Sequence, residues 1–394
     1  MAARMLVGTR VLDLSRLLPG PFATQLLADL GAEVIKIEEP GKGDGSRHLR
    51  TSLRGYGSTF LMLNRNKKSM TLNLKSKAGV EVFRRLAGRS DVVVEGFRPG
   101  VVDRLGIGYN SLKRDNRKLI YLSLTGYGQD GPYAQRPGHD VNYLSFAGLA
   151  SLTGHRGGTP VSPGVQAADV AGGALMAAFA VMVGLYHRER TGRGQYIDVA
   201  MMDGLLAMGQ TLFGEYFSTG TLPGPGTMRL SGGYPCYGIY ETSDKKYFAL
   251  GALEEKFYET FCRKAGRPDL IAGHNFKNET ERAKLEKELR ALFKQRTREE
   301  WTQLLADEDV CGSPVLTLAE ALADPQAAHR KMFMEGPHPE GGTVPQVAFP
   351  IKFSDAEQIP PGAAPRLGQH TEEVLLAVGY TRNEIERFKK EGVV

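Results

Sequence analysis

The stretch RVLDLSRLLPGPFATQLLADLGAEVIKIEE, residues 10–39, contains the pattern that decides the fold. RVLDLS and EVIKIEE are short runs rich in β-forming residues, and GPFATQLLADLG between them has the apolar spacing of a helix. We interpret this order as strand, helix, strand. Such a unit joins two strands of a parallel sheet through a helix that covers the sheet.

Further short apolar runs continue the same architecture. SMTLNL, DVVVEGF and LIYLSLTGYG are predicted strands, and KAGVEVFRRLAG is a predicted helix between the first two. We therefore expect an α/β fold whose large domain has a Rossmann-like parallel sheet. The GxGxxG and GxxxxGK[ST] fingerprints are absent, so the sequence predicts no dinucleotide or nucleoside-triphosphate site.

The composition changes after a long predicted helix at about 169–189. Residues 218–233 are rich in Gly and Pro and predict a connection between domains. We expect the N-terminal part of the large domain at 1–217, a smaller α+β domain at 234–318, and a return to the large domain at 319–394. YGIYETSDKKYFALGA predicts a hairpin that turns at Ser243 and Asp244, and 255–306 is predicted to be largely helical.

Composition restricts the class of partner. The 394 residues include 50 Lys and Arg against 44 Asp and Glu, which gives a net charge of +6 and a pI near 9.0. The basic residues are scattered and no nucleic-acid-binding motif is present, so we expect no nucleic-acid partner. A polyanionic small ligand would be equally favoured by a modest positive charge.

The cysteines and the apolar segments indicate the compartment. Cys236, Cys262 and Cys311 form no CxxC or Cys/His pattern, so neither a disulfide framework nor a metal site is predicted, and we expect a cytoplasmic protein. The N-terminus has no secretory signal pattern, and the final EGVV is not a peroxisomal address. Residues 170–186 carry no charge, but their Ala and Gly content and charged flanks favour a helix buried in protein over a membrane span.

Three acid/base residues carry the chemistry that the sequence suggests: His139, Asp169 and Glu254. To invert a carbon next to a carbonyl, one group must take a proton from one face and another must return a proton to the opposite face. A lone Asp could instead attack a thioester and carry the acyl group. Structural alternatives exist as well, because Asp is a preferred helix N-cap and a loop His is usually structural. Glu before a helix also complements the helix dipole.

The segments LLPGPFATQLLADLGAEVIKIE, EGFRPGVVDRLGIGY and GHDVNYLSFAG, with VQAADVAGG and GQHTEEVL, resemble the family III CoA-transferases. The segment with His139 resembles the α-methylacyl-CoA racemase branch of that family. This resemblance implies a catalytic role for His139, Asp169 and Glu254 and an orienting role for Asp140. It also implies an acyl-CoA substrate from fatty acid metabolism, an interlocked homodimer, and no cofactor besides the coenzyme A of the substrate.

The resemblance also suggests which residues contact coenzyme A. Its phosphates favour Arg and Lys, and the strand ends of parallel sheets are the usual ligand edge. The predicted contact residues are Leu17, Leu18, Pro19, Arg65, Lys67, Lys68, Arg98 and Arg104. One departure concerns the nucleotide end, because racemases often carry Arg-Pro where this chain has Glu39-Pro40.

The favoured hypothesis is a racemase that inverts the α-carbon of 2-methylacyl-CoA thioesters. Either Asp169 or the His139/Glu254 pair removes the α-proton, and the enolate is reprotonated from the other side. Backbone N–H groups of Asp169, Gly172 and Gly173 are candidate donors to the enolate oxygen. The alternative is a CoA-transferase that uses Asp169 as the nucleophile. A non-enzymatic CoA sensor or nucleic-acid-binding protein leaves the three residues without a purpose.

Overall fold

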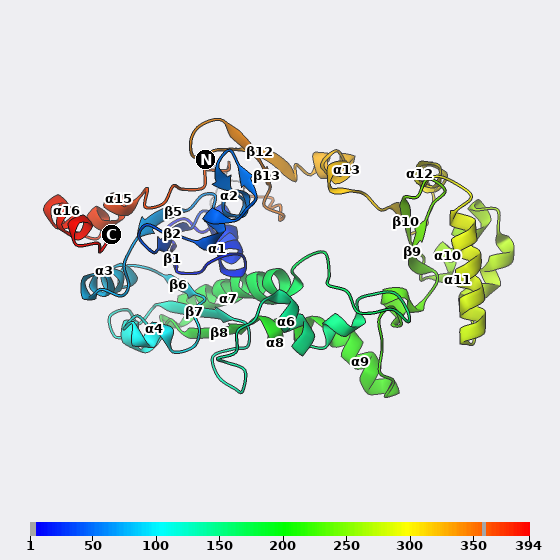
Figure 1. Ribbon diagram of the computed structural model, residues 1–394, viewed down its shortest axis with the longest axis horizontal. Helices are drawn as coiled ribbons and strands as arrows, with labels where there is room; N and C mark the ends of the chain where they lie inside the picture. Colours follow the sequence, from blue (N-terminus) through cyan, green and yellow to red (C-terminus); the bar gives the residue numbers. More distant parts are fainter. Residues whose placement is uncertain (1–4, 357–359) are drawn as a thin grey trace. The chain divides into compact units, whose positions relative to one another are not determined.

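The computed structural model describes residues 5–356 and 360–394. The chain divides into two compact units (Figure 1). The first comprises residues 1–147, 165–208 and 326–394, and the second comprises residues 148–164 and 209–325. The predicted connection at 218–233 therefore lies within the second unit, and the change of unit comes at residue 209.

The first unit is built on a six-stranded sheet whose neighbouring strands are all parallel. Its spatial order is β5-β2-β1-β6-β7-β8. The strands are β1 (Arg10–Asp13), β2 (Glu33–Glu38), β5 (Lys68–Thr71), β6 (Val92–Glu95), β7 (Ile120–Thr125) and β8 (Tyr196–Ala200). The predicted parallel sheet is confirmed. The chain winds outward in both directions from β1 and β6, so the switch point, where ligands bind such sheets, lies between those two strands.

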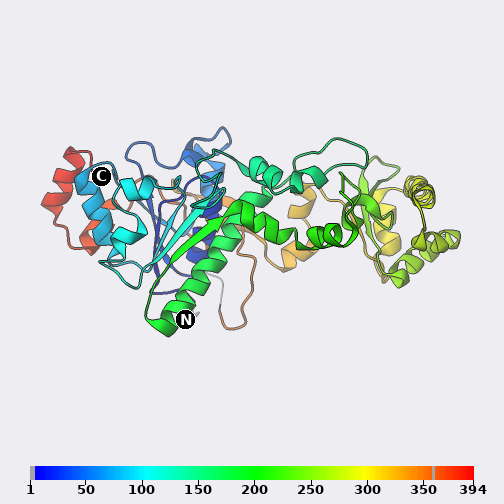
Figure 2. The same ribbon diagram turned by 90° about the horizontal axis from the view of Figure 1, so that it is seen from below.

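Helices and small hairpins surround this sheet (Figures 1 and 2). The helices of the first unit are α1 (Pro19–Asp29), α2 (Ser58–Leu63), α3 (Lys77–Ala87), α4 (Val101–Arg104), α5 (Tyr109–Leu112), α6 (Asp140–Phe146), α7 (Met176–Thr191), α8 (Met201–Met208), α15 (Thr371–Ala377) and α16 (Arg382–Lys390). Two hairpins, β3 (Ser52–Leu53) with β4 (Tyr56–Gly57) and β12 (Phe333–Pro337) with β13 (Thr343–Val347), belong to the same unit.

The C-terminal segment is attached to the edge strand β5. The backbone N–H of His370 donates to the Ser69 carbonyl at 2.9 Å, and the Thr71 N–H donates to Thr371 Oγ1 at 3.1 Å. Apolar residues of α15 and α16 then complete the core that α3 and the strands begin. The GQHTEEVL motif therefore covers an otherwise open sheet edge.

The second unit has its own antiparallel sheet and aromatic core. Its sheet order is β11-β10-β9, with β9 (Tyr237–Glu241), β10 (Tyr247–Gly251) and β11 (Gly312–Pro314). Its helices are α9 (Gln210–Thr219), α10 (Glu255–Lys264), α11 (Glu279–Phe293), α12 (Arg298–Leu305) and α13 (Leu318–Leu322), and α14 (Pro325–His329) follows at the boundary. Phe293 stacks on Tyr240 at 4.7 Å and accepts the Trp301 indole N–H at 2.9 Å. The predicted hairpin and helical stretch are both confirmed.

The long apolar helix is only partly buried, whereas the sequence predicted a helix buried in protein. Residues 168–191 form one helix long and apolar enough to cross a membrane, with 44% of its most apolar window buried. Val181 and Leu185 face the core, whereas Phe179 is 67% exposed and Tyr186 63% exposed. Because α7 packs on α1, β7 and β8 of a parallel sheet unit, its length and composition are weak evidence for a membrane span.

Candidate active site

The loops that follow β1 and β6 meet at the switch point of the sheet. The Arg16 guanidinium lies 5.2 Å from the centre of the Phe97 ring, which joins the two loops. Glu95, at the end of β6, is buried, and its Oε2 accepts the Phe97 N–H at 2.7 Å. Burial raises the pKa of Glu95 to about 7. Arg98 is exposed on the same loop.

His139 and Asp140 lie where the chain, after leaving β7, enters α6. The His139 backbone N–H donates to Asn142 Oδ1 at 3.0 Å, and its side chain is exposed. A Cβ at Gly138 would lie 2.7 Å from the Tyr143 ring, so the residue before His139 has to be glycine unless that ring moves. The packing of α6 thus fixes the backbone that presents the imidazole.

Asp140 caps the helix that carries Asp169. Its Oδ1 accepts the backbone N–H of Ala168 at 2.7 Å and that of Asp169 at 3.0 Å. The alternative interpretation of Asp169 as the N-cap is therefore wrong, because Asp169 lies inside the first turn and Asp140 supplies the cap. Asp140 thus fixes the backbone of Asp169, and its orienting role in catalysis stays a prediction.

The turn that holds Asp169 is a π-helix, Ala168–Leu175, which continues into α7. Wide π-turns within helices frequently occur at functional sites. This turn packs against α1 and α8. A Cβ at Gly172 would lie 2.6 Å from the Met201 carbonyl oxygen, so Gly172 permits close approach to α8. The N–H of Asp169 is already donated to Asp140, and Gly172 and Gly173 are buried. We therefore drop these amides as donors to an enolate.

The environment of Asp169 favours proton exchange near neutral pH. Burial raises the pKa of its carboxyl to about 6, the negative charge of Asp140 adds to the rise, and His139 opposes it. A carboxylate with this pKa serves as a base or a nucleophile at pH 7. His139 is the residue before Asp140, so the cap that Asp140 forms brings the segment of His139 next to the turn of Asp169.

An aromatic cluster that sequence reasoning missed borders this site. Tyr143 donates its hydroxyl proton to the Gly138 carbonyl at 2.6 Å, and its ring packs edge-to-face on Tyr127 at 5.1 Å. Burial raises the pKa of Tyr143 to about 12, with further contributions from Tyr127 and Asp169, while the charge of Arg98 opposes the rise. Phe146 extends the cluster and is partly exposed. The signal in the sequence was the aromatic content of GYGQDGPY and NYLSF.

Glu254 lies in the second unit, immediately before α10. Its carbonyl accepts the N–H groups of Phe257 and Tyr258, and its side chain is exposed. The predicted position before a helix is confirmed. Its predicted pairing with His139 stays a prediction.

The predicted coenzyme A contacts fall into two groups. Leu17 and Leu18 lie in the loop after β1, and Pro19 is the first residue of α1. Arg98 is exposed in the loop that follows β6, and Arg104 is exposed at the end of α4. Arg65, Lys67 and Lys68 are instead held in ion pairs.

The ion pairs of these three residues are structural. Arg65 is buried and binds both Asp29 oxygens, at 3.0 and 2.5 Å. The Lys67 side chain is fully buried, and its Nζ lies 3.1 Å from Asp13 Oδ2. Lys68 begins β5 at the amino edge of the sheet and pairs with Glu33 at 2.6 Å and Glu373 at 2.7 Å. We therefore remove these three residues from the candidate ligand site. The described residues contain no group of three or more His, Cys, Asp or Glu that would hold a metal ion.

Comparison with known proteins places this chain in one family. The family model for CoA-transferase family III matches residues 6–371. The chain is 35% identical to human α-methylacyl-CoA racemase, over 99% of this chain and 97% of that protein. It is 37% identical to human succinyl-CoA:glutarate CoA-transferase, over 99% of this chain and 90% of that protein. The crystal structure of a CAIB/BAIF family protein from Brucella suis matches with a TM-score of 0.83 and 32% identity, covering 96% and 100% of the two chains. This chain belongs to CoA-transferase family III.

Proposed function

We propose that the chain is a racemase that inverts the α-carbon of 2-methylacyl-CoA thioesters. The observation that carries the proposal is the arrangement of His139, Asp140 and Asp169. Asp140 caps the turn that holds Asp169, and His139, the residue before Asp140, is therefore carried next to that turn. Two acid/base groups of different kind are what a two-sided proton transfer requires.

In the proposed reaction one group removes the α-proton and the C–H electron pair moves into the thioester carbonyl, which gives a planar enolate. The second group then donates a proton to the opposite face, and the carbonyl re-forms. Asp169 and the His139/Glu254 pair exchange these two roles when the substrate has the opposite configuration. The reaction requires no cofactor, because coenzyme A is part of the substrate.

The competing proposal is a CoA-transferase in which Asp169 attacks the thioester carbon and expels the CoA thiolate. The relatives favour neither activity, since a racemase and a CoA-transferase match at 35% and 37% identity. His139 favours the racemase in our interpretation, because acyl transfer through Asp169 needs no second proton donor on the far side of the carbon.

Deuterium exchange distinguishes the two activities. The chain is incubated with a 2-methylacyl-CoA in deuterated buffer, with no acceptor acid, and the α-carbon is followed by NMR or mass spectrometry. A racemase incorporates deuterium and converts either pure stereoisomer into a mixture of both. The absence of exchange, together with transfer of CoA to an added carboxylic acid, would establish the transferase instead.

For substrate binding we retain Leu17, Leu18, Pro19, Arg98 and Arg104. The first three lie between the carboxyl end of β1 and the first residue of α1, and Arg98 follows β6 across the switch point. Exposed guanidinium groups suit phosphate recognition. The reacting end would lie toward Asp169, whose turn packs on α1.

We also propose that the working unit is a homodimer. Each unit exposes apolar side chains that a second copy would cover. On α7 these include Phe179, Val183 and Tyr186, and on the sheet of the second unit Ile239 and Tyr247 border a surface groove. The family resemblance argues for a second copy of this chain as the occupant of these faces.

A further inference from the structure

Leu17 has an unusual backbone for its type. Its φ is 65°, the left-handed conformation that L-residues other than glycine, Asn and Asp rarely adopt. Among the described non-glycine residues with positive φ, which also include Arg54, Asn66, Lys245 and Lys331, Leu17 is the one apolar residue. Its side chain is 44% exposed at the carboxyl end of β1. A disfavoured conformation persists only where surrounding contacts impose it.

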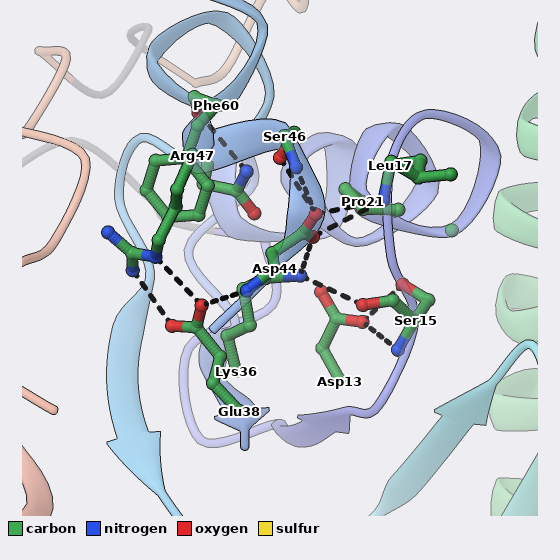
Figure 3. Close-up of polar contacts among 12 residues, drawn as sticks. Asp13, Ser15, Leu17, Pro21, Lys36, Glu38, Asp44, Ser46, Arg47 and Phe60 are labelled. Carbon is green, nitrogen blue, oxygen red and sulfur yellow. Dashed lines mark hydrogen bonds and ion pairs between the residues drawn. The ribbon is translucent and has the colours of Figure 1, made fainter. Parts of the chain in front are cut away.

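The contact that imposes it comes from Asp44. The Leu17 N–H donates to the two carboxylate oxygens of Asp44, at 3.1 and 3.3 Å (Figure 3). The buried Lys36 Nζ lies 2.8 Å from Asp44 Oδ2 and donates to the Ser15 carbonyl at 2.9 Å. One buried ammonium group therefore binds both the carboxylate that holds Leu17 and the backbone two residues before Leu17.

Asp44 is itself held from several sides. Ser46 donates its N–H and its hydroxyl to Asp44 Oδ1, each at 2.8 Å. Glu38 Oε1 accepts the Asp44 N–H at 2.9 Å, and the Glu38 carboxylate also binds Arg47 Nε and Nη2, each at 2.8 Å. The Arg47 guanidinium lies 3.6 Å from the centre of the Phe60 ring. The Asp44 carboxylate is thus fixed in position independently of Leu17.

The neighbourhood of Leu17 indicates what its exposed side chain is for. The adjacent Arg16 stacks on Phe97, which precedes the exposed Arg98. An apolar side chain held beside a guanidinium group at the switch point suits a ligand that combines an apolar part with phosphates.

We propose that Asp44 is a positioning residue for ligand binding: the Lys36–Asp44 pair holds Leu17 in its left-handed conformation so that its side chain forms an apolar seat for the coenzyme A portion of the substrate. The proposal rests on the proposed function, since that function supplies the ligand. Asp44 acts through the Leu17 backbone, and it does not touch the ligand.

The test measures the affinity for free coenzyme A by calorimetry and the thermal midpoint of the same samples. Removing Asp44 itself would take the ion-pair partner from the buried Lys36 and would destabilise the fold, so milder variants are used. Leu17→Gly removes the side chain and the backbone penalty together. We expect the affinity to fall about tenfold, the loss of one well-covered apolar side chain, with a thermal midpoint equal to or above that of the parent. Lys245→Gly is the control, because it relieves the same left-handed backbone penalty in the hairpin between β9 and β10. This change should leave the affinity for coenzyme A unchanged.

Ser46→Ala tests the role of Asp44. It removes one hydrogen bond to Asp44 and leaves the Lys36 ion pair intact. We expect it to weaken coenzyme A binding in the parent and to have no further effect in the Leu17→Gly background, because the seat is then already absent.

The outcomes separate the two proposals. Unchanged affinity in Leu17→Gly, or equal losses from Ser46→Ala in both backgrounds, would overturn the positioning role and leave the proposed function intact. Coenzyme A binding with the expected variant effects but without α-proton exchange would support the seat and contradict the racemase. A parent chain that does not bind coenzyme A would overturn both.

Discussion

The pKa of the Asp169 carboxyl is raised because the group is partly buried and because Asp140 is negatively charged. Replacing Asp140 by Asn keeps an oxygen that accepts the N–H groups of Ala168 and Asp169, and removes the charge. Asp169 then ionises more easily, so the acid limb of the pH–rate profile should move from near pH 6 to lower pH by about one unit. The measurement is α-proton exchange between pH 4 and 9. A limb that stays in place or moves upward would contradict this electrostatic account.

Replacing Asp169 by Asn should inactivate the enzyme and stabilise the fold. The folded-state pKa of Asp169 lies above its usual value of 3.8, so ionising it costs the folded state stability as the pH rises from about 4 to about 6. Because the side chain is only partly buried, we expect the penalty above pH 6 to be about 1 kcal/mol after solvent screening. Urea denaturation should therefore show Asp169→Asn as more stable than the parent at pH 8, and as no more stable at pH 4. An equal difference at both pH values would assign the effect to packing.

His139 tests the two-sided reaction most directly. His139→Ala should lower the rate of racemisation about a hundredfold to ten-thousandfold, the usual loss for one acid/base group, while coenzyme A affinity changes little. Proton exchange on the face served by Asp169 should persist for one stereoisomer. The measurement compares exchange and inversion for each pure stereoisomer. Racemisation at the parent rate would remove His139 from the mechanism and favour acyl transfer.

At the level of single residues, sequence patterns identify candidate acid/base residues better than they identify the hydrogen-bond and ion-pair partners of those residues. His139 and Asp169 could be selected from residue type and motif. The cap that Asp140 provides to Ala168 and Asp169 could not be predicted, because its donors lie 28 and 29 positions along the chain. For the same reason Arg65 and Lys67 resembled phosphate ligands, although Asp29 and Asp13 neutralise them inside the fold.

At the level of elements, the strands of the sheet were predictable because each is a short apolar run between polar turns. The attachment of the GQHTEEVL segment to β5 depends on hydrogen bonds across about 300 residues, which no local pattern encodes. α7 shows a different limit. The uncharged run at residues 170–186 predicted a buried helix. Periodicity does not reveal whether an apolar face of that helix packs within the chain or against another molecule.

The exposed face of α7 provides a prediction about assembly. Phe179→Glu places a charge on that face, and we expect the proposed homodimer to dissociate. The secondary structure should persist, because the Phe179 side chain is largely exposed and contributes little to the core of its own chain. The measurements are light scattering and circular dichroism at several concentrations. Glu189→Lys, an exposed charge change near the end of the same helix, serves as the control. A monomeric parent, or a variant that remains a dimer, would show that a second copy does not cover this face.

At the level of the whole molecule, the chain leaves the first unit after Met208 and re-enters it at Gln326. The sequence predicted these changes at 217 and 319, because composition reports turns, whereas unit boundaries follow from contacts. A single residue, Gly209, separates α8 from α9, so no Gly/Pro-rich stretch marks this earlier boundary. The segment 148–164 belongs to the second unit and lies between α6 and the turn of Asp169 in the sequence.

This division raises the question of which chain completes each active site, since His139 and Asp169 belong to the first unit and Glu254 belongs to the second. In an interlocked dimer each site would take Glu254 from the partner. Co-expression of Asp169→Ala and Glu254→Ala chains would then yield heterodimers in which one site lacks both groups and the other retains both. Two differently tagged chains allow the heterodimer to be purified. Its α-proton exchange can then be compared with that of the Asp169→Ala homodimer and that of the Glu254→Ala homodimer. We expect activity to return in the heterodimer alone, because only there does an intact Asp169 meet an intact Glu254. A heterodimer as inactive as both parents would place Glu254 beside His139 of its own chain.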